Sequence, residues 1–217
     1  MKKALILGCS HSVGAEMHTE PGLSFATLEQ GIQYDLENCY PAQIARALGY
    51  NPVNRGISGG SNDAMFRLFL DTALSDQDIV IACWTGVNRS EIYTHQWQQL
   101  CPGDVPSKID HDYFKQWVLY SGNTEVGMFN KTKNILALNA LAQARGIPVI
   151  NIDSFWKIDF WPKVDFSWPD NVTWPTDIDF MTWCEQHDFA HTLKVHFFKS
   201  AHDSYAQHVL ENLRGRF

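Results

Sequence analysis

The chain has 217 residues, of which 45% are hydrophobic and 19% are charged, and its formal net charge at pH 7 is −7. This balance is typical of one folded domain and excludes a disordered chain. The acidic isoelectric point, about 5.6, argues against nucleic acid and against an anionic membrane surface as partners.

The five cysteines are odd in number, widely spaced and form no CxxC pair. This usage argues against a disulfide framework and favours a reducing compartment. The apolar run after Lys2 and Lys3 is too short for a signal peptide, and no stretch reaches the length of a membrane-spanning helix. We therefore expect a cytoplasmic protein.

Strand and helix patterns alternate along the chain. We expect strands at 3–8, 52–54, 78–84 and 147–152, and helices at 41–48, 61–74, 132–145 and 200–213. Between them we expect a loop with at most one helical turn over 14–38, and a long excursion over 85–125 with one helix near 110–120. The alternation predicts a single α/β domain over 1–217, with three α/β/α layers and a doubly wound, mostly parallel sheet of about five strands.

An aromatic-rich insertion interrupts this pattern at about 154–185, where tryptophan and phenylalanine alternate with proline and aspartate. A segment of this composition cannot form a regular helix, and its length calls for a packing or functional reason. One interpretation is that its aromatic side chains cover one end of the sheet. The other is that they form a wall of a substrate site, where indole rings stack on sugars or acyl chains.

Three predicted strands are followed by turns that suit acyl-transfer chemistry. Ser10 lies in the first turn after strand 3–8, a glycine-rich turn containing Gly59 follows strand 52–54, and Asn88 follows strand 78–84. Parallel strands bring their carboxyl ends to one edge of a sheet, where ligands bind. A hydroxyl, a glycine N–H and an amide would therefore meet at one crevice, as a serine nucleophile and its oxyanion hole require.

These turns resemble the sequence blocks of the GDSL/SGNH hydrolase superfamily. Residues 8–14 (GCSHSVG) are similar to the GDSxxxG block, with Cys9 in place of aspartate. Residues 54–59 (NRGISG) are similar to the N-x-G-x-S-G block, and residues 86–89 (GVNR) to GxND, with Arg89 in place of aspartate. The resemblance implies a flavodoxin-like fold, Ser10 as the nucleophile, and Ser10, Gly59 and Asn88 as the oxyanion hole.

The family's last block, DxxHP, has two candidates in this chain. His196 has Ala201 and Ala206 at the family's usual offsets from the catalytic histidine, but Leu193 stands where the aspartate is expected and Phe197 replaces the proline. We therefore take His196 as the first choice for the base, with its acidic partner still open.

His191 has the expected aspartate, Asp188, but lies far from the start of the last helix. Three arrangements remain open: His196 oriented by Asp188 or by a backbone carbonyl, a His191–Asp188 pair, or a Ser-His dyad without an acidic member. In the template triad, loss of the acidic member lowers the rate by orders of magnitude.

Three other kinds of site have weaker support. The spacing of His187 and His191 would suit two metal ligands on one helical face, but no cysteine or glutamate follows at ligand spacing. Cys9 could act as a thiol nucleophile near a helix start, although burial is the commoner fate of such a residue. The first turn lacks the GxGxxG of a dinucleotide site.

The function that the sequence predicts is hydrolysis of a carboxylic ester through an acyl-enzyme, with an O-acetyl group on a carbohydrate as one candidate substrate. Neither a cofactor nor a metal is expected, and the expected partner is a small-molecule or carbohydrate ester. Two alternatives remain: an SGNH-like carbohydrate-binding module that uses the aromatic insertion, and acyl transfer to a hydroxyl acceptor.

Overall fold

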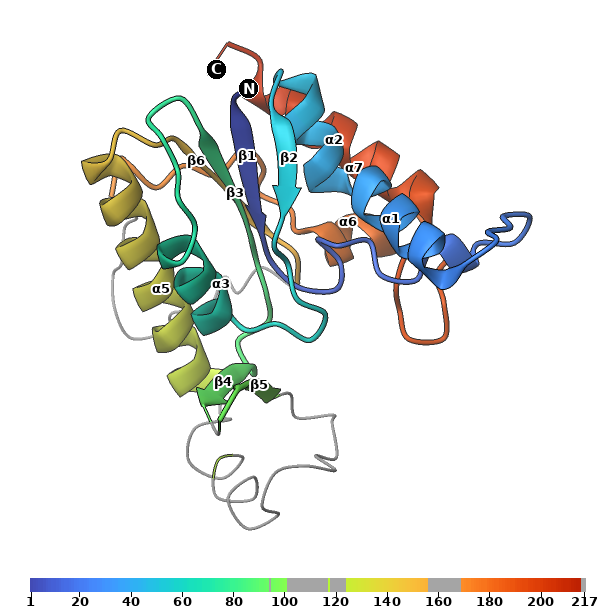
Figure 1. The fold of residues 1–217 in the computed structure, drawn as a ribbon, viewed down its shortest axis with the longest axis horizontal. Helices are drawn as coiled ribbons and strands as arrows, with labels where there is room; N and C mark the ends of the chain where they lie inside the picture. Colours follow the sequence, from blue (N-terminus) through green and yellow to red (C-terminus); the bar gives the residue numbers. More distant parts are fainter. Residues whose placement is uncertain (94, 101–116, 118–123, 156–168, 216–217) are drawn as a thin grey trace.

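The computed structural model describes residues 1–93, 95–100, 117, 124–155 and 169–215 (Figure 1). Within them, a four-stranded parallel sheet contains β1 (Lys3–Leu7), β2 (Asn51–Asn54), β3 (Ile79–Trp84) and β6 (Val149–Asp153) in the order β2-β1-β3-β6. The predicted α/β class with a parallel sheet is confirmed. All four carboxyl ends lie at the same edge, so the segments after Leu7, Asn54, Trp84 and Asp153 are neighbours.

Strands β1, β3 and β6 bury side chains on both faces of the sheet, since successive side chains of a strand point to opposite sides. Ile6, Ile81 and Ile152 belong to one apolar cluster and pack with residues of α2 and α7. Leu7, Ala82 and Trp84 belong to a second cluster and pack with α3 and α5. Figure 1 shows these two helical layers on either side of the strands.

The helices of the described residues have the following bounds. They are α1 (Leu28–Asn38), α2 (Tyr40–Ala47), α3 (Asn62–Leu70), α5 (Thr124–Ala144), α6 (Phe180–Gln186) and α7 (Lys199–Leu213), with a short 3-10 helix, η1 (Met17–Thr19), before α1. The predicted helices at 41–48, 61–74, 132–145 and 200–213 correspond to α2, α3, α5 and α7.

Helix α1 lies where the sequence predicts a loop with at most one helical turn. The Thr27 side chain caps it by accepting a hydrogen bond from the Gln30 N–H. Its buried residues are Gly31 and Asp35 rather than aliphatic ones, so it lacks the apolar period that reveals most helices. Instead Asp35 accepts hydrogen bonds from the backbone N–H and the imidazole of His18, both at 2.6 Å.

The long excursion after β3 contains an antiparallel hairpin of β4 (Ser90–Tyr93) and β5 (Trp97–Leu100). The helix expected near 110–120 and residues 156–168 of the aromatic insertion lie outside the described residues. Within the described part of the insertion, α6 packs against the sheet with Phe180 fully buried, in agreement with a packing role for that part.

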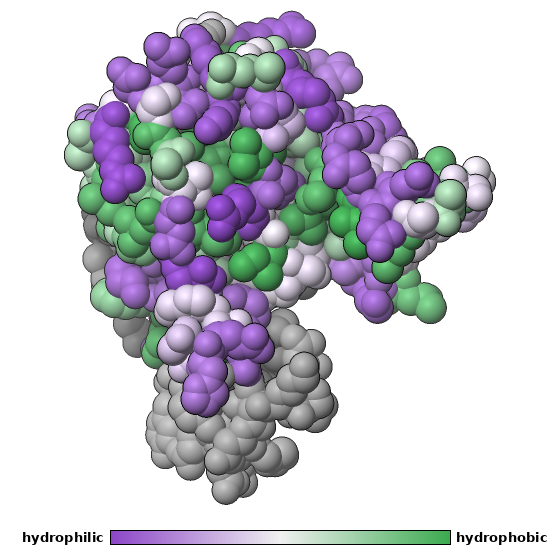
Figure 2. All heavy atoms as spheres, in the orientation of Figure 1, coloured by the Kyte–Doolittle hydropathy of each residue, from purple (hydrophilic) through white to green (hydrophobic). Residues whose placement is uncertain are grey.

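On the face drawn in Figure 2, hydrophilic and hydrophobic residues are interspersed. Among the helices that the structure describes, none combines the length and the apolar character needed to cross a membrane.

Candidate functional site

The turn after β1 places Ser10 at the carboxyl edge of the sheet. Backbone hydrogen bonds fold it tightly, with the N–H groups of Ser12 and Val13 donating to the Cys9 carbonyl at 3.0 and 3.1 Å, and that of Ala15 to the Ser10 carbonyl at 2.9 Å. Ser10 is 4% exposed. The residue is therefore almost fully covered at this edge of the sheet.

The glycine turn after β2 lies directly against the first turn. The Ile57 N–H donates to the Gly8 carbonyl at 3.0 Å, and the Asn54 side chain donates to the Ser12 carbonyl at 3.0 Å. A Cβ added at Gly60 would lie 2.6 Å from the Ile57 carbonyl oxygen, so no larger residue fits there. The turn that contains Gly59 is thus brought to the segment that contains Ser10, as predicted.

Gly59 itself has a φ of +74°, a left-handed conformation that favours glycine. An added Cβ at Gly59 would meet nothing within 4 Å, which leaves open space beside its backbone. Steric freedom for a ligand next to this N–H is what an oxyanion donor requires.

The turn after β3 is held by α3. The Asn62 side chain accepts a hydrogen bond from the Thr85 N–H at 3.0 Å and donates to the Thr85 carbonyl at 3.3 Å. Gly127 of α5 packs against the Val87 carbonyl so closely that an added Cβ would lie 2.1 Å from that oxygen. Asn88 follows in an exposed turn at the same edge of the sheet.

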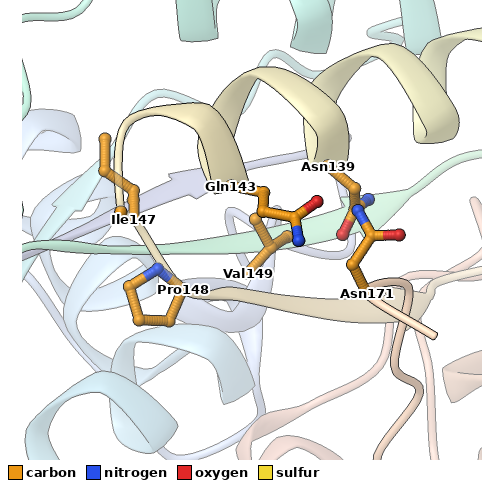
Figure 3. Close-up of a pocket in the computed structure, with 7 residues that line it drawn as sticks. Asn139, Gln143, Ile147, Pro148, Val149 and Asn171 are labelled. Carbon is orange, nitrogen blue, oxygen red and sulfur yellow. The ribbon is translucent and has the colours of Figure 1, made fainter.

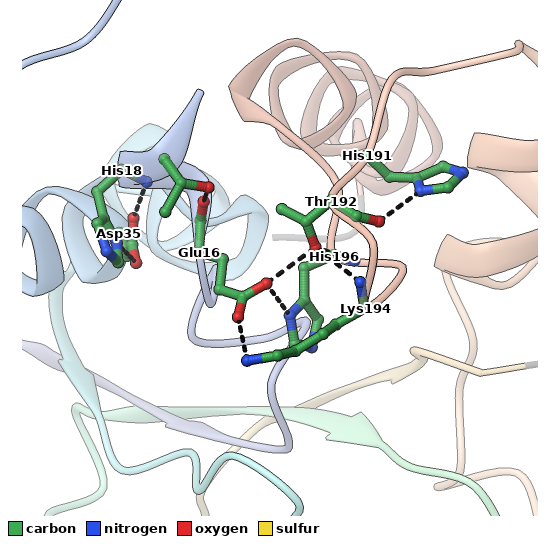
Figure 4. A network of polar contacts seen from close by, with 8 residues as sticks. Glu16, His18, Asp35, His191, Thr192, Lys194 and His196 are labelled. Atoms are coloured by element: carbon green, nitrogen blue, oxygen red, sulfur yellow. Dashed lines mark hydrogen bonds and ion pairs between the residues drawn. The ribbon is translucent and has the colours of Figure 1, made fainter. Parts of the chain in front are cut away.

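His196 approaches this edge from the C-terminal part of the chain, and its acidic partner is Glu16. Its Nδ1 lies 3.2 Å from Glu16 Oε2, and the two side chains are 16% and 24% exposed, respectively (Figure 4). The His196 ring also lies 5.5 Å from the ring of His11, centroid to centroid. Since His11 is the residue after Ser10, this contact brings the imidazole of His196 to the turn of the predicted nucleophile.

A short hairpin around residues 191–197 holds His196 against Glu16. Thr192 donates its N–H to the His196 carbonyl at 2.8 Å and its hydroxyl to Glu16 Oε2 at 2.9 Å. The Lys194 ammonium donates to the other Glu16 oxygen at 2.7 Å. Glu16 and Val195 both have φ values in the left-handed region, 66° and 61°, so backbone strain accompanies this arrangement.

The carboxylate of Glu16 is strongly favoured in its charged form. The hydrogen bond from Lys194 is the largest cause, with those from Thr192 and His196 adding to it, and together they lower the pKa of Glu16 to about 2 despite partial burial. A permanent negative charge therefore lies on the Nδ1 side of His196, and Nε2 is the nitrogen left for a second partner.

The other predicted candidates lie elsewhere. His191 is exposed, and its Nδ1 is 2.8 Å from the Thr192 carbonyl. Asp188 is also exposed, and in the described part of the chain it makes no hydrogen bond with either His191 or His196. Glu16 occupies the position beside His196 that the sequence interpretation gave to Asp188.

His187 stacks on Trp183, with ring centroids 4.1 Å apart. The described residues contain no group of three or more potential metal ligands. Cys9 is fully buried among the core residues, where a thiol is inert because no substrate reaches it.

The sequence interpretation missed two residues of this site, Glu16 and His11. Burial, together with the nearby charges of His196, His202 and Arg89, lowers the pKa of His11 well below its usual value, so its imidazole is neutral. The position of His11 next to Ser10 is a signal in the sequence that indicates a place in the site. No such signal marks Glu16, because its pairing with His196 depends on a left-handed backbone and on a hairpin 180 residues away.

The structure also has a surface cavity of about 250 Å³ at the far end of β6 (Figure 3). It is lined by Asn139, Gln143, Gly146, Ile147, Pro148, Val149 and Asn171. Val149 begins β6, so the cavity lies at the amino edge of the sheet, opposite to Ser10. Asn139 is engaged in hydrogen bonds with Asn151 at 3.0 and 3.1 Å, which is a structural role.

No protein-family model and no curated protein matches the sequence. Solved structures do match. Esterase EstA from Pseudoalteromonas sp., in a structure inhibited by monoethylphosphonate, superimposes with a TM-score of 0.50 at 12% identity, covering 99% of this chain and 97% of that one.

Two further matches are a member of the lipolytic G-D-S-L family from Veillonella parvula and a GDSL-like lipase from Bacteroides thetaiotaomicron. The first has a TM-score of 0.47 at 14% identity and covers 97% of each chain. The second has a TM-score of 0.48 at 11% identity and covers 100% of this chain and 89% of the lipase. At 12% identity, the match to esterase EstA concerns the fold alone: this chain has the same α/β fold as that esterase over 99% of its length.

Proposed function

We propose that this protein is a serine ester hydrolase in which Ser10 is the nucleophile, His196 the base and Glu16 the acidic member of the triad. The observation that supports this most directly is the 3.2 Å contact between Glu16 and His196 beside the turn that contains Ser10. A carboxylate, an imidazole and a nearly buried hydroxyl at one sheet edge are the components of nucleophilic acyl transfer.

The pairing at Nδ1 defines what His196 can do. With Nδ1–H donated to Glu16, Nε2 carries the lone pair that accepts the proton of the attacking Ser10 hydroxyl. The imidazolium that forms is stabilised by the Glu16 carboxylate, which remains ionised because its pKa is near 2. In the described structure no hydrogen bond yet joins Ser10 to His196, and such bonds commonly form only once substrate is bound.

The reaction then follows two acyl-transfer steps. Ser10 Oγ adds to the ester carbonyl, and the tetrahedral oxyanion accepts hydrogen bonds from the N–H groups of Ser10 and Gly59 and from the Asn88 amide. His196 returns its proton to the departing alkoxide, which leaves an acyl group on Ser10. Water, deprotonated by His196, cleaves this acyl-enzyme and releases the acid.

For the substrate, we propose a small ester such as an O-acetyl group on a carbohydrate. The aromatic composition of residues 154–185 supports a sugar-stacking wall. A hydroxyl acceptor in place of water would make the same site an acyltransferase, and product analysis with and without added alcohol distinguishes the two reactions.

A fluorophosphonate probe tests the nucleophile, and the phosphonate-inhibited relative makes this reagent a natural choice. We expect labelling of the wild-type protein, loss of labelling in Ser10→Ala, and unchanged labelling in Ser58→Ala, a control in the exposed part of the glycine turn. Absence of labelling in the wild type between pH 6 and 9 would reject the enzyme and favour the carbohydrate-binding alternative.

A further inference from the structure

Buried polar atoms without a hydrogen-bond partner gather near the proposed catalytic site. His11 Nδ1, Thr85 Oγ1 and Arg89 Nη1 are buried atoms of this kind, and they belong to the segments that follow β1 and β3. Most buried polar groups in folded proteins are hydrogen-bonded, so each exception calls for an explanation. A site that awaits a polar ligand is one such explanation.

Arg89 is the most informative of these residues because its group is charged. Its guanidinium lies over the ring of Phe155, 4.7 Å from the centroid. The Phe155 ring meets His11 at 4.6 Å, and His11 meets His196 at 5.5 Å. This series of ring contacts brings the cation to the same side of the sheet as the proposed base, which agrees with its electrostatic effect on His11.

The comparison with Arg67 shows what Arg89 lacks. Arg67 also lies over an aromatic ring, that of Trp97, but donates two hydrogen bonds of 2.9 Å to the carboxylate of Glu91. Arg89 has no carboxylate partner among the described residues, although the chain as a whole is acidic. Holding a partly buried guanidinium without a counter-charge is unfavourable unless a ligand supplies one.

We propose that Arg89 forms an anion-binding subsite, so that the preferred substrates are esters with a carboxylate or phosphate group near the scissile bond. The guanidinium offers planar, paired donors that match either group. The Phe155 ring lies against one face of the Arg89 guanidinium. The neutral His11, with Nδ1 unpartnered, offers a second polar contact without adding a competing charge. This inference rests on the proposed esterase function and adds the charge of the substrate to it.

Matched ester pairs test the subsite. The first pair places the anion in the acyl group: mono(4-nitrophenyl) adipate against 4-nitrophenyl hexanoate. The second pair places it in the alcohol: the acetate ester of glycerol 3-phosphate against glycerol monoacetate. We expect kcat/KM to be about ten- to a hundredfold higher for the anionic member of one pair, which is the range expected for one charge-assisted hydrogen bond. The pair that shows this preference identifies whether the anion belongs to the acyl group or to the alcohol.

Variants then assign the preference to Arg89. In Arg89→Met the ratio of anionic to neutral kcat/KM should fall at least tenfold, and Arg89→Lys should restore part of it. Arg145→Met is the matched control, because Arg145 also lies over an aromatic ring, that of Phe69, at 5.4 Å. An equal loss for both members of a pair, or no preference in the wild type, overturns the subsite while leaving the esterase intact.

A binding measurement separates failure of the subsite from failure of the esterase. In Ser10→Ala protein, titration calorimetry should detect adipate or glycerol 3-phosphate but neither dimethyl adipate nor glycerol, and Arg89→Met should abolish the signal. Arg89-dependent binding would support the subsite even if no ester were hydrolysed. Binding that persists in the double variant would overturn it.

Discussion

Replacing Glu16 by glutamine tests the acidic member of the triad, since it removes a charge and keeps the shape. At 3.2 Å, unit charges interact by about 1.3 kcal/mol at a dielectric constant of about 80 and by about 5 kcal/mol at an effective constant of about 20. Glu16 is 24% exposed and already shares its charge with Lys194, so an intermediate value applies. The imidazolium forms in the transition state. Losing about 3 kcal/mol of stabilisation of that state corresponds to a loss of about 150-fold in kcat.

The assay is hydrolysis of 4-nitrophenyl acetate, with the rate of fluorophosphonate labelling as a second measure of Ser10 reactivity. Glu20→Gln is the control: it removes a nearby carboxylate that accepts a hydrogen bond from the Lys199 N–H and does not contact His196. Lys194→Met should change kcat by less than about threefold, because exposed ion pairs contribute little. Lys194 is 75% exposed.

A second variant asks whether an aspartate at residue 193, where the DxxHP block of the GDSL/SGNH hydrolases has one, can take over the role of Glu16. Leu193 occupies that position and is fully exposed at the tip of the hairpin. We therefore expect Leu193→Asp to leave kcat of the Glu16→Gln variant unrestored. A kcat within threefold of wild type in folded Glu16→Gln, or full rescue by Leu193→Asp, would refute the assignment.

Three further predictions concern the oxyanion hole, a buried ion pair and acid stability. Asn88→Ala should lower kcat by about a hundredfold or more in the same assay, with KM little changed, as expected for one oxyanion donor. Lys131→Met should lower the unfolding free energy by about 3 kcal/mol or more in urea titrations, because it removes the ammonium from a buried ion pair with Asp153. Burial lowers the pKa of His202 to about 3, and its Nδ1 accepts a hydrogen bond from the Tyr40 N–H. The unfolded chain binds a proton near pH 6.5 that the folded protein cannot, so stability should fall as the pH drops from about 6.5 toward 3, and His202→Gln should flatten that slope in urea titrations at pH 7.5 and 5.

The sequence was sufficient to predict the sheet and most of the helices around it. Strand β3 (Ile79–Trp84) is apolar throughout because both of its faces are buried, and that property is visible in a single sequence. Helix α1 was missed because its buried face consists of Gly31 and Asp35, so its pattern resembles that of a polar loop. Periodicity detects helices that bury aliphatic side chains, whereas the buried Asp35 of α1 accepts hydrogen bonds from His18.

The candidate site was predictable to the extent that it follows strand ends. Ser10 and Gly59 lie in turns whose proximity follows from the parallel order of the strands, and the hydrogen bond from Ile57 to Gly8 agrees with it. The sequence interpretation places the acidic partner of His196 nearby along the chain, at Asp188, whereas Glu16 is 180 residues away in sequence. No local pattern encodes a contact that depends on two left-handed residues and on the docking of a distant hairpin.

That separation has a consequence for how the protein would lose activity. Glu16 and His196 meet only while the hairpin at 191–197 rests on the N-terminal segment, and the hairpin exposes Leu193, Lys194 and Val195 to solvent. Segments with few buried contacts open at a lower free energy than a central sheet. Mild heating or dilute urea should therefore abolish turnover before circular dichroism records a loss of secondary structure, so that turnover would report sub-global opening of the chain.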